Sequence, residues 1–444
     1  MCRRTLLLAL IAALLLVYSW AWADLDRSKK PADDLPSDVA STWLEELYDV
    51  VKAEKTTPPM ASRIYGITAV ALYESIVAGT EAHRSLVGQL NGLASLPQPA
   101  KRKYHWPTVA NAVLATTIRG LYPMISQASL ETINHLEESF ASQQQAVVPR
   151  PMYERSVAHG RAVARAILKW AATDGFSIYN DCPYVPVSEP GAWEPTPPDF
   201  NPNPLQPCWG MIRPMVLTSG EECSPPGPPV FSTDRTSNFY AAGLEVYHVV
   251  LDLTEEQKTI ADYWSDGPGD TGTPPGHWIA IVSQIARHDE LSLAAAAEAY
   301  ARVGIAVHDA FINCWTPKYF YNLQRPVTYI QDNINATWLP YIMTPPFPTY
   351  TSGHSTQSGA AAHVLTDMFE SKRFTDTTHT DHGLVPPQEP RTFDSFDAAA
   401  AEAAVSRLYG GIHFAFDNDN GLASGQCIGQ VIIDRVRFRN EDNE

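Results

Sequence analysis

Two cations with a fixed spacing form the first segment whose residues could do chemistry. Lys318 and Arg325 lie seven positions apart, and Pro326 follows the arginine directly. Cations this close repel each other unless solvent screens them or an anion binds between them. By itself the segment allows two interpretations, a solvated helix surface or an anion clamp. The remaining sequence has to decide between them.

A second segment, residues 351–354, places small polar groups at the start of a predicted helix. Ser352, Gly353 and His354 precede an alanine-rich stretch. A helix start exposes unpaired backbone N–H groups and the positive end of the helix dipole, and both favour an anion. Ser352 is also a good N-cap residue, so simple capping explains the serine but not the glycine and histidine after it.

The third segment, residues 406–417, combines an arginine with a histidine and an aspartate. Arg407 precedes His413 by six positions, and Asp417 follows the histidine by four. On a helix this spacing puts the carboxylate on the imidazole's face, where it accepts the outer N–H and fixes the tautomer. A pair of this kind that occurs alone is more often structural.

Together the three segments predict an oxyanion site in an acidic protein. The chain has 49 acidic and 32 basic residues, a formal charge of −17, which disfavours nucleic acid and anionic lipid as partners. Against that background the second half gathers one lysine, two arginines and two histidines in these segments. Arginine forks suit tetrahedral oxyanions, and of two histidines one can coordinate or attack while the other moves protons.

These residues resemble the signature of the phosphatidic acid phosphatase type 2 and vanadium haloperoxidase superfamily, which reads K-x6-R-P, P-S-G-H and S-R-x5-H-x3-D. Order and internal spacings match from Lys318 to Asp417. The one departure is Thr351 in place of proline, which we expect to loosen the turn without removing a ligand. The stretches DGPGDTGTPPGHW and GGIHFAFDNDNGLASG also look like the bacterial vanadium-dependent haloperoxidase branch. The resemblance thus extends over most of the mature chain.

The resemblance implies how an anion would be held. The side chains of three cations would neutralise the equatorial oxygens of vanadate or phosphate, and a hydroxyl and a backbone amide would donate further hydrogen bonds. Phosphate would compete with vanadate, the expected cofactor, for one pocket. The residues concerned are Lys318, Arg325, Arg407, Ser352 and Gly353.

The resemblance also assigns the chemistry to the two histidines. His413 would be the axial ligand to vanadium, oriented by Asp417, and His354 would be the acid–base group. A haloperoxidase would oxidise halide with hydrogen peroxide to hypohalous acid, which halogenates small organic acceptors. In an acid phosphatase, His413 would instead attack phosphorus to give a phosphohistidine, and His354 would protonate the leaving group.

Aromatic residues bear on the choice between these activities. Trp315 precedes Lys318 by three residues, and Phe347 precedes His354 by seven. By resemblance to chloride-oxidising relatives, such aromatics would exclude water and leave room for a halide, while ordinary core packing explains them equally well. Export and chain length favour the haloperoxidase, because lipid phosphatases of the superfamily are usually small membrane proteins. A homo-oligomer is compatible with the sequence.

The elements that must position these residues are predicted to be helical. Five helical patterns occupy residues 38–175, helices resume near residue 236, and a last helical group begins near residue 353 with a break at 376–391. Between the first two groups, residues 183–229 contain 14 prolines, which exclude a continuous helix or a central strand. We expect this stretch to cross the molecule as a belt. Its apolar anchors would be Trp193, Phe200, Trp209 and Met211.

The N-terminus has the pattern of a signal peptide. Arg3 and Arg4 precede an apolar run that ends on an A-x-A motif at residues 21–23. We expect cleavage there and a secreted or periplasmic mature chain without membrane attachment; an uncleaved anchor is the alternative. The fold prediction is all-α, with two helical bundles joined by a long proline-rich connection. The parts are a leader at 1–23, an N-terminal helical bundle at 24–182, a connecting belt at 183–235, and a C-terminal helical bundle at 236–444 with the oxyanion site.

Export permits disulfide bonds. The chain has six cysteines, of which Cys2 lies in the leader, and it has no C-x-x-C pair that would indicate zinc or redox chemistry. Cys182, Cys208 and Cys223 share the proline-rich stretch, so we expect a disulfide among them without being able to assign the pair. Cys314, in an apolar helix, is predicted to be free.

Histidines outside the signature are interpreted as structural. His277, His288 with Asp289, and His308 with Asp309 occur in or beside predicted helices, where capping and core hydrogen bonds are commoner than metal ligation. Asp309 is the one member of this group that could support Lys318 or an arginine of a neighbouring turn.

Overall fold

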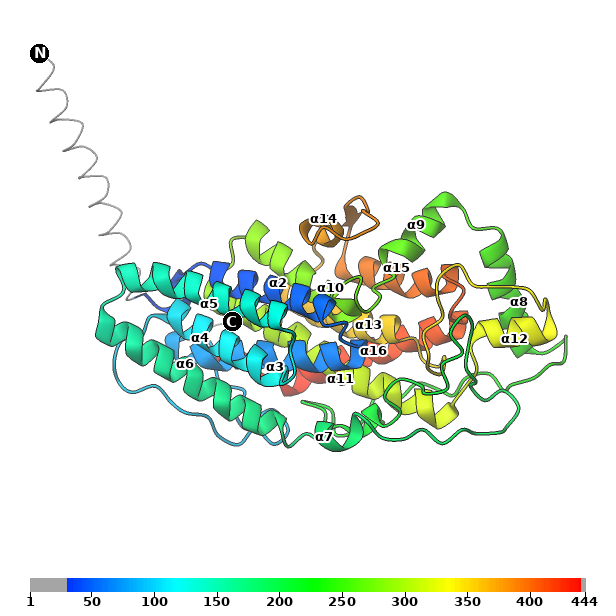
Figure 1. Cartoon of the computed structure of the whole chain (residues 1–444), viewed down its shortest axis with the longest axis horizontal. Helices are drawn as coiled ribbons and strands as arrows, with labels where there is room; N and C mark the ends of the chain where they lie inside the picture. Colours follow the sequence, from blue (N-terminus) through cyan, green and yellow to red (C-terminus); the bar gives the residue numbers. More distant parts are fainter. Residues whose placement is uncertain (1–29, 441–444) are drawn as a thin grey trace, which may run out of the picture.

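Helices form almost all of the regular structure, and most of them run along the long axis of the protein (Figure 1). The computed structural model describes residues 30–440, so the predicted signal peptide, residues 1–23, lies outside the described residues. In this range the only strands are β1 (Phe374–Asp376) and β2 (Arg391–Phe393), which pair antiparallel at the predicted break in the last helical group. The predicted all-α class is confirmed.

The first half contains the five long helices that the periodicity predicts. Its elements are η1 (Ala32–Asp34), α2 (Asp38–Ala53), α3 (Pro58–Ile76), η2 (Val77–Gly79), α4 (Trp106–Leu121), α5 (Gln127–Val147), α6 (Arg150–Ala171) and α7 (Phe176–Tyr179). Local signals set their starts. Ser126 accepts the N–H of Ser129 at 3.2 Å to cap α5, and α3, α4 and α6 have proline in the first turn, where no N–H is needed.

The second half begins at α8, after the belt. Its helices are α8 (Asn238–Leu251), α9 (Glu255–Tyr263), α10 (Thr273–His288), α11 (Leu293–Tyr321), α12 (Pro326–Asn333), α13 (Gly353–Phe369), α14 (Thr378–Asp381), α15 (Phe396–Tyr409) and α16 (Ala415–Arg435). None of the helices in residues 30–440 combines the length and the apolar character needed to cross a membrane.

The proline-rich belt has a single short helix, η3 (Trp209–Met211). Of its predicted anchors, Trp193 and Trp209 are buried, whereas Phe200 and Met211 are 58% and 61% exposed. The anchoring prediction is therefore half wrong. The burial of an aromatic residue in a segment without periodicity depends on which face of the belt meets the helices, and no local pattern encodes that face.

Asp309 of α11 fastens the belt to the second half. Its carboxylate accepts the backbone N–H groups of Met215 at 2.6 Å, Val216 at 2.8 Å and Leu217 at 2.9 Å. The suggestion that Asp309 supports Lys318 is wrong, because these three amides occupy its oxygens. The structural interpretation of this aspartate holds.

Two disulfides constrain the belt. Cys182 pairs with Cys208, as one of the expected pairings within the proline-rich stretch. Cys223 pairs instead with Cys427 of α16, at a sequence separation of 204 residues. Cys314 is free and buried, as predicted.

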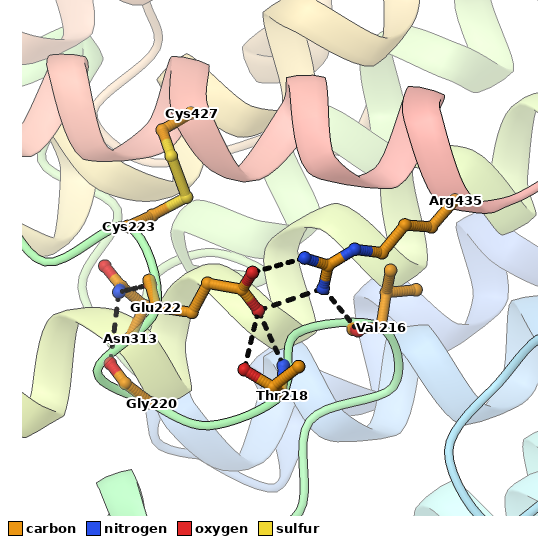
Figure 2. The surroundings of a disulfide bond; sticks show 8 residues. All are labelled: Val216, Thr218, Gly220, Glu222, Cys223, Asn313, Cys427 and Arg435. Atoms are coloured by element: carbon orange, nitrogen blue, oxygen red, sulfur yellow. Dashed lines mark hydrogen bonds and ion pairs between the residues drawn. A yellow bond between two sulfur atoms is a disulfide. The ribbon is translucent and has the colours of Figure 1, made fainter.

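Figure 2 shows how the distal disulfide joins the belt to α16. Beside Cys223, the Glu222 carboxylate pairs with the Arg435 guanidinium, with one oxygen 3.0 Å from Nη1. This pairing holds the pKa of Glu222 at about 2. From α11, the side chain of Asn313 donates to the Glu222 carbonyl at 2.6 Å. The end of the belt is thus fixed to α11 and α16, two helices that also carry residues of the signature.

One hydrophobic core runs through both halves. Buried side chains from Ala32 to Phe438 belong to it, and α3 packs along α11 while α2 packs on α10. Where α3 crosses α11, a Cβ on Gly66 would lie 2.8 Å from the Gly304 carbonyl oxygen, so only glycine permits this approach. The predicted domain boundaries at residues 182 and 235 lie on either side of the belt. Because one core spans both halves, the division into two bundles stays a prediction.

Close packing of α13 on α16 brings two signature segments together. A Cβ on Gly359 of α13 would lie 2.8 Å from the Leu422 carbonyl oxygen of α16. The N-termini of both helices therefore meet, and the Ser352 amide donates to the Asp417 carbonyl at 3.1 Å.

Candidate functional site

A cavity of about 350 Å³ lies where the second-half helices face the belt. Its lining includes both histidines of the signature, Gly353 and Arg407, and the aromatic pair Trp315 and Phe347. Four further signature residues are buried in or behind its wall, namely Lys318, Arg325, Ser352 and Asp417. The three signature segments, far apart in sequence, thus meet around one hollow.

Lys318 lies in the last turn of α11 and is fully buried. Its ammonium donates to the carbonyls of Pro348 at 3.1 Å and Thr349 at 2.9 Å, and also to that of Thr351. Burial, and after it the neighbouring Arg325, lower the pKa of Lys318 to about 8. The lysine is therefore held by backbone oxygens, without a carboxylate partner. Thr351, the departure from the signature, contributes a carbonyl oxygen to Lys318.

Arg325 occupies the N-cap position of α12 and is also fully buried. Its Nε donates to the Phe347 carbonyl at 2.7 Å, and its Nη1 donates to the Ile412 carbonyl at 2.8 Å and to His413 Nε2 at 3.1 Å. Its Nη2 is buried and has no hydrogen-bond partner among the described residues. Burial lowers the pKa of this guanidinium to about 9. One arm of the arginine thus remains available for a ligand.

The N-terminus of α13 forms another part of the wall. Ser352 caps the helix by accepting the Ser355 N–H at 3.4 Å, so the predicted capping is confirmed. Gly353 is the first helical residue, and a Cβ there would meet the rings of Trp315 and Phe311 at 3.6 and 3.8 Å. Any larger residue would take space from the cavity. First-turn N–H groups lack partners inside their own helix, so they are free to bind an anion.

His413 and Asp417 form the predicted pair, but not on one helix. His413 lies in the loop before α16, and only Asp417 is in the helix, in its first turn. Asp417 Oδ2 accepts from His413 Nδ1 at 2.9 Å, from the Phe414 N–H at 3.1 Å, and from the Thr349 hydroxyl. Capping of α16, rather than helical i, i+4 geometry, therefore brings the carboxylate to the imidazole. The Nδ1–H of His413 thus donates to Asp417, and the lone pair of Nε2 accepts a hydrogen bond from Arg325.

His354 and Arg407 stand on another side of the cavity. Arg407 Nη1 lies 3.4 Å from His354 Nε2, and the other arms of the guanidinium donate to the Ala261 carbonyl at 3.2 Å and the Ser406 hydroxyl at 3.1 Å. Burial, reinforced by Arg407, holds the pKa of His354 well below its ordinary value. The pKa of His413 is likewise depressed, by burial and then by Arg325. Both histidines are thus neutral near pH 7.

The charges of the site suit an oxyanion. Lys318, Arg325 and Arg407 are at most 1% exposed, and none has a carboxylate within 4.0 Å among residues 30–440. Buried charges are normally paired, and Arg325 Nη2 has no hydrogen-bond partner in the described part of the chain. Within the same range no three His, Cys, Asp or Glu side chains gather to hold a metal cation. The donor set therefore fits vanadate or phosphate, and His413 Nε2, which faces Arg325 at 3.1 Å, is a nitrogen that can coordinate.

The aromatic pair lines the cavity beside these cations. The Trp315 and Phe347 ring centroids lie 5.1 Å apart. Phe347 also stacks under the cations, with Arg325 Cζ 4.7 Å and Lys318 Nζ 5.1 Å from its centroid. Both rings face the hollow and also pack in the core, so their role toward halide stays a prediction.

The sequence reasoning missed several residues of the site. Asp266, in the loop before α10, lines the cavity with its Oδ2 4.0 Å from His354 Nε2. Asp266 is the first residue of the stretch DGPGDTGTPPGHW, whose family resemblance is the signal that could have identified it. The Thr349 hydroxyl and the belt residues 196–199 and 201 gave no local signal, because only the folded loops bring them to the cavity.

Comparisons with known proteins agree with this geometry. Residues 298–441 match the model of the VCPO second helical-bundle domain. Vanadium chloroperoxidase of Curvularia inaequalis is 26% identical over 215 residues, which are 35% of this chain and 35% of that protein. The match thus spans about a third of the length of that relative.

Solved structures extend the similarity to the whole fold. The crystal structure of the first bacterial vanadium-dependent iodoperoxidase superposes with a TM-score of 0.85 at 33% identity, covering 93% of this chain and 99% of that one. Holo-type bacterial vanadium-dependent chloroperoxidase gives a TM-score of 0.64 at 15% identity, over 85% of this chain and 92% of that one. The second likeness concerns the fold alone.

Proposed function

Because this chain belongs to the vanadium-dependent haloperoxidase family, we propose that it uses vanadate to oxidise halide with hydrogen peroxide to hypohalous acid. One observation carries the proposal. Three buried cations, which have no carboxylate partner within residues 30–440, lie around a histidine whose outer nitrogen is fixed by a buried aspartate. Small organic acceptors would consume the hypohalous acid.

The chain's own residues would hold the cofactor in a defined way. Lys318, Arg325 and Arg407 would bind the oxygens of vanadate, and the first-turn amides of α13 would add hydrogen bonds. His413 would coordinate through Nε2, because Asp417 accepts its Nδ1–H and so fixes the tautomer. Bound vanadate would supply a Lewis-acidic centre that activates peroxide toward halide.

His354 would move protons. Halide oxidation consumes one proton per peroxide, since hydrogen peroxide, halide and a proton give hypohalous acid and water. The depressed pKa of His354 keeps its ring neutral and ready to accept a proton from peroxide. An anion bound at Arg407 would raise that pKa, because negative charge favours the protonated ring. The same group could then return the proton to the departing oxygen.

Location outside the cytoplasm is part of the proposal. The signal-peptide pattern at residues 1–23 supports a secreted or periplasmic mature chain. The disulfides Cys182–Cys208 and Cys223–Cys427 support an oxidising compartment as well.

A parallel assay on the purified protein tests the function against its alternative, an acid phosphatase with a phosphohistidine. Apo-protein is titrated with orthovanadate, and halogenation of a phenol is followed with peroxide and chloride, bromide or iodide. Hydrolysis of an aryl phosphate is followed without vanadate. We expect halogenation that requires vanadate. Phosphate release without any halide oxidation would refute the haloperoxidase and support the phosphatase.

A further inference from the structure

Behind the cavity wall a buried histidine bridges two buried carboxylates. His277 of α10 has Nδ1 3.1 Å from Asp266 Oδ2 and Nε2 2.7 Å from Asp376 Oδ2, and all three side chains are at most 1% exposed. A carboxylate oxygen beside each ring nitrogen favours an imidazolium, which donates from both nitrogens. Burial lowers the pKa of His277, but the two carboxylates outweigh it and raise that pKa to about 10. Stacking on Trp264, at 4.4 Å between centroids, fixes the ring.

The far end of this bridge is anchored. Asp376, the last residue of β1, also accepts the Thr378 N–H at 2.9 Å and its hydroxyl at 2.6 Å. Gln284 of α10 adds a longer hydrogen bond to the same oxygen at 3.3 Å. Asp376 is therefore unable to follow His277 or Asp266 if either moves. Within the described residues, only the Asp266 end faces the cavity.

Asp266 lies next to a cation that it does not bind. Arg407 Nη1 contacts the carbonyl of the preceding residue, Ser265, at 3.5 Å, yet no ion pair within 4.0 Å joins Asp266 to this arginine. A buried arginine beside a buried carboxylate normally forms a bidentate pair with it. Here the carboxylate is turned toward His277, from a backbone at φ 49°, a left-handed conformation that aspartate tolerates better than most residues.

We propose that His277 and Asp376 are positioning residues that hold the Asp266 carboxylate away from Arg407, and so leave this arginine free to bind the oxyanion. The inference rests on the proposed function, because it takes the oxyanion site as given. Without the imidazolium, the Asp266 carboxylate next to Arg407 loses its partner. It then turns to the guanidinium and competes with vanadate or phosphate for the same N–H groups.

The test measures oxyanion binding to the apo-protein, so it does not depend on turnover. Dissociation constants for orthovanadate and for inorganic phosphate are determined by calorimetry. His277→Gln removes the imidazolium, and we expect it to weaken both anions about tenfold or more, as outer-shell partners commonly do. The double variant His277→Gln/Asp266→Asn should bind again nearly as the unsubstituted protein does, because no carboxylate remains to occupy Arg407. This rescue is a result that a merely structural role of His277 would not give.

A matched control comes from the same neighbourhood. His379 of α14 is buried, lies 6.3 Å from His277 between ring centroids, and contacts the Tyr263 carbonyl at 2.9 Å. No hydrogen bond or ion pair joins it to Asp266 among the described residues, so His379→Gln should leave both dissociation constants unchanged. If His379→Gln weakens binding as much as His277→Gln, general loosening of this region explains the effect and the inference is wrong.

Other outcomes separate the inference from the function. Unchanged affinity in His277→Gln, or a double variant no better than the single one, overturns the inference alone. If His277→Gln does not fold, Asp266→Asn decides. It should bind both anions at least as tightly as the unsubstituted protein, and weaker binding would mean that Asp266 supports Arg407 and would overturn the inference. If the unsubstituted protein binds neither anion, the proposed function fails and this inference fails with it.

Discussion

Replacing Asp417 tests how the protein prepares His413 as a ligand. Asp417 Oδ2 accepts three hydrogen bonds, from His413 Nδ1 at 2.9 Å, from the Phe414 N–H at 3.1 Å, and from the Thr349 hydroxyl. Asp417→Ala leaves these buried donors without an acceptor, at a cost of about 1–3 kcal/mol each before water or repacking relieves it. It also frees the imidazole to rotate. We expect vanadate affinity to fall about 10- to 100-fold, or about 1.4–2.8 kcal/mol.

The isosteric Asp417→Asn separates orientation from charge. All three donors meet on Oδ2, whereas Oδ1 is buried without a partner among the described residues. An asparagine oxygen can thus replace Oδ2, and its amide takes the place of Oδ1, so the tautomer of His413 is preserved. Burial already raises the pKa of Asp417 to about 6, so its charge is weakly held. We expect Asp417→Asn to retain most of the affinity that Asp417→Ala loses.

The assay compares vanadium content after dialysis and the vanadate dissociation constant for both variants, beside urea unfolding to confirm that each is folded. Unfolding free energy should fall more in Asp417→Ala than in Asp417→Asn. If Asp417→Asn binds vanadate as poorly as Asp417→Ala, charge rather than orientation is decisive. Affinity in Asp417→Ala equal to that of the unsubstituted protein would refute the role of the carboxylate altogether.

Four further predictions follow from the same geometry. His413→Ala should lose both vanadium retention and bromination, whereas His354→Ala should retain vanadium and lose about 100- to 10,000-fold in bromination rate. Equal vanadium content in His413→Ala and the unsubstituted protein would contradict the role of His413 as the vanadium ligand. Phosphate in large excess should inhibit reconstitution with vanadate, and a flat response would exclude a shared pocket. Burial lowers the pKa of His105, the N-cap residue of α4, to about 4. The neutral ring stabilises the fold above the unfolded pKa, so the free energy of unfolding should fall by about 2 kcal/mol as pH drops from 7 to 5. In urea unfolding, His105→Gln should lose less stability over the same pH range. Serine substitution of the Cys223 disulfide, which closes 204 residues, should cost about 5 kcal/mol, against about 3–4 kcal/mol for the Cys182 disulfide, which closes 26; equal losses in thermal melts would contradict the loop-entropy argument.

Features that depend on neighbours in the chain were predictable. Helix periodicity and proline placement located the five helices of the first half, and Ser352 caps α13 as its residue type indicates. The signature spacing alone identified Lys318, Arg325 and Arg407 as one group of cations. The helices and the cap are local properties, because caps, turns and i, i+4 spacings are decided by a few consecutive residues. The grouping of the three cations came instead from the resemblance of the whole signature.

Contacts between distant segments were decided only by the tertiary structure. Cys223 pairs with Cys427 rather than within the belt, because the belt runs back along α16. His413 meets Asp417 through the capping of a helix that does not include the histidine. His277, interpreted from the sequence as structural, joins Asp266 of a loop to Asp376 of a strand. A sequence specifies which groups can bind one another. Tertiary packing decides which of several possible partners they contact, because it sets the distances between buried charges.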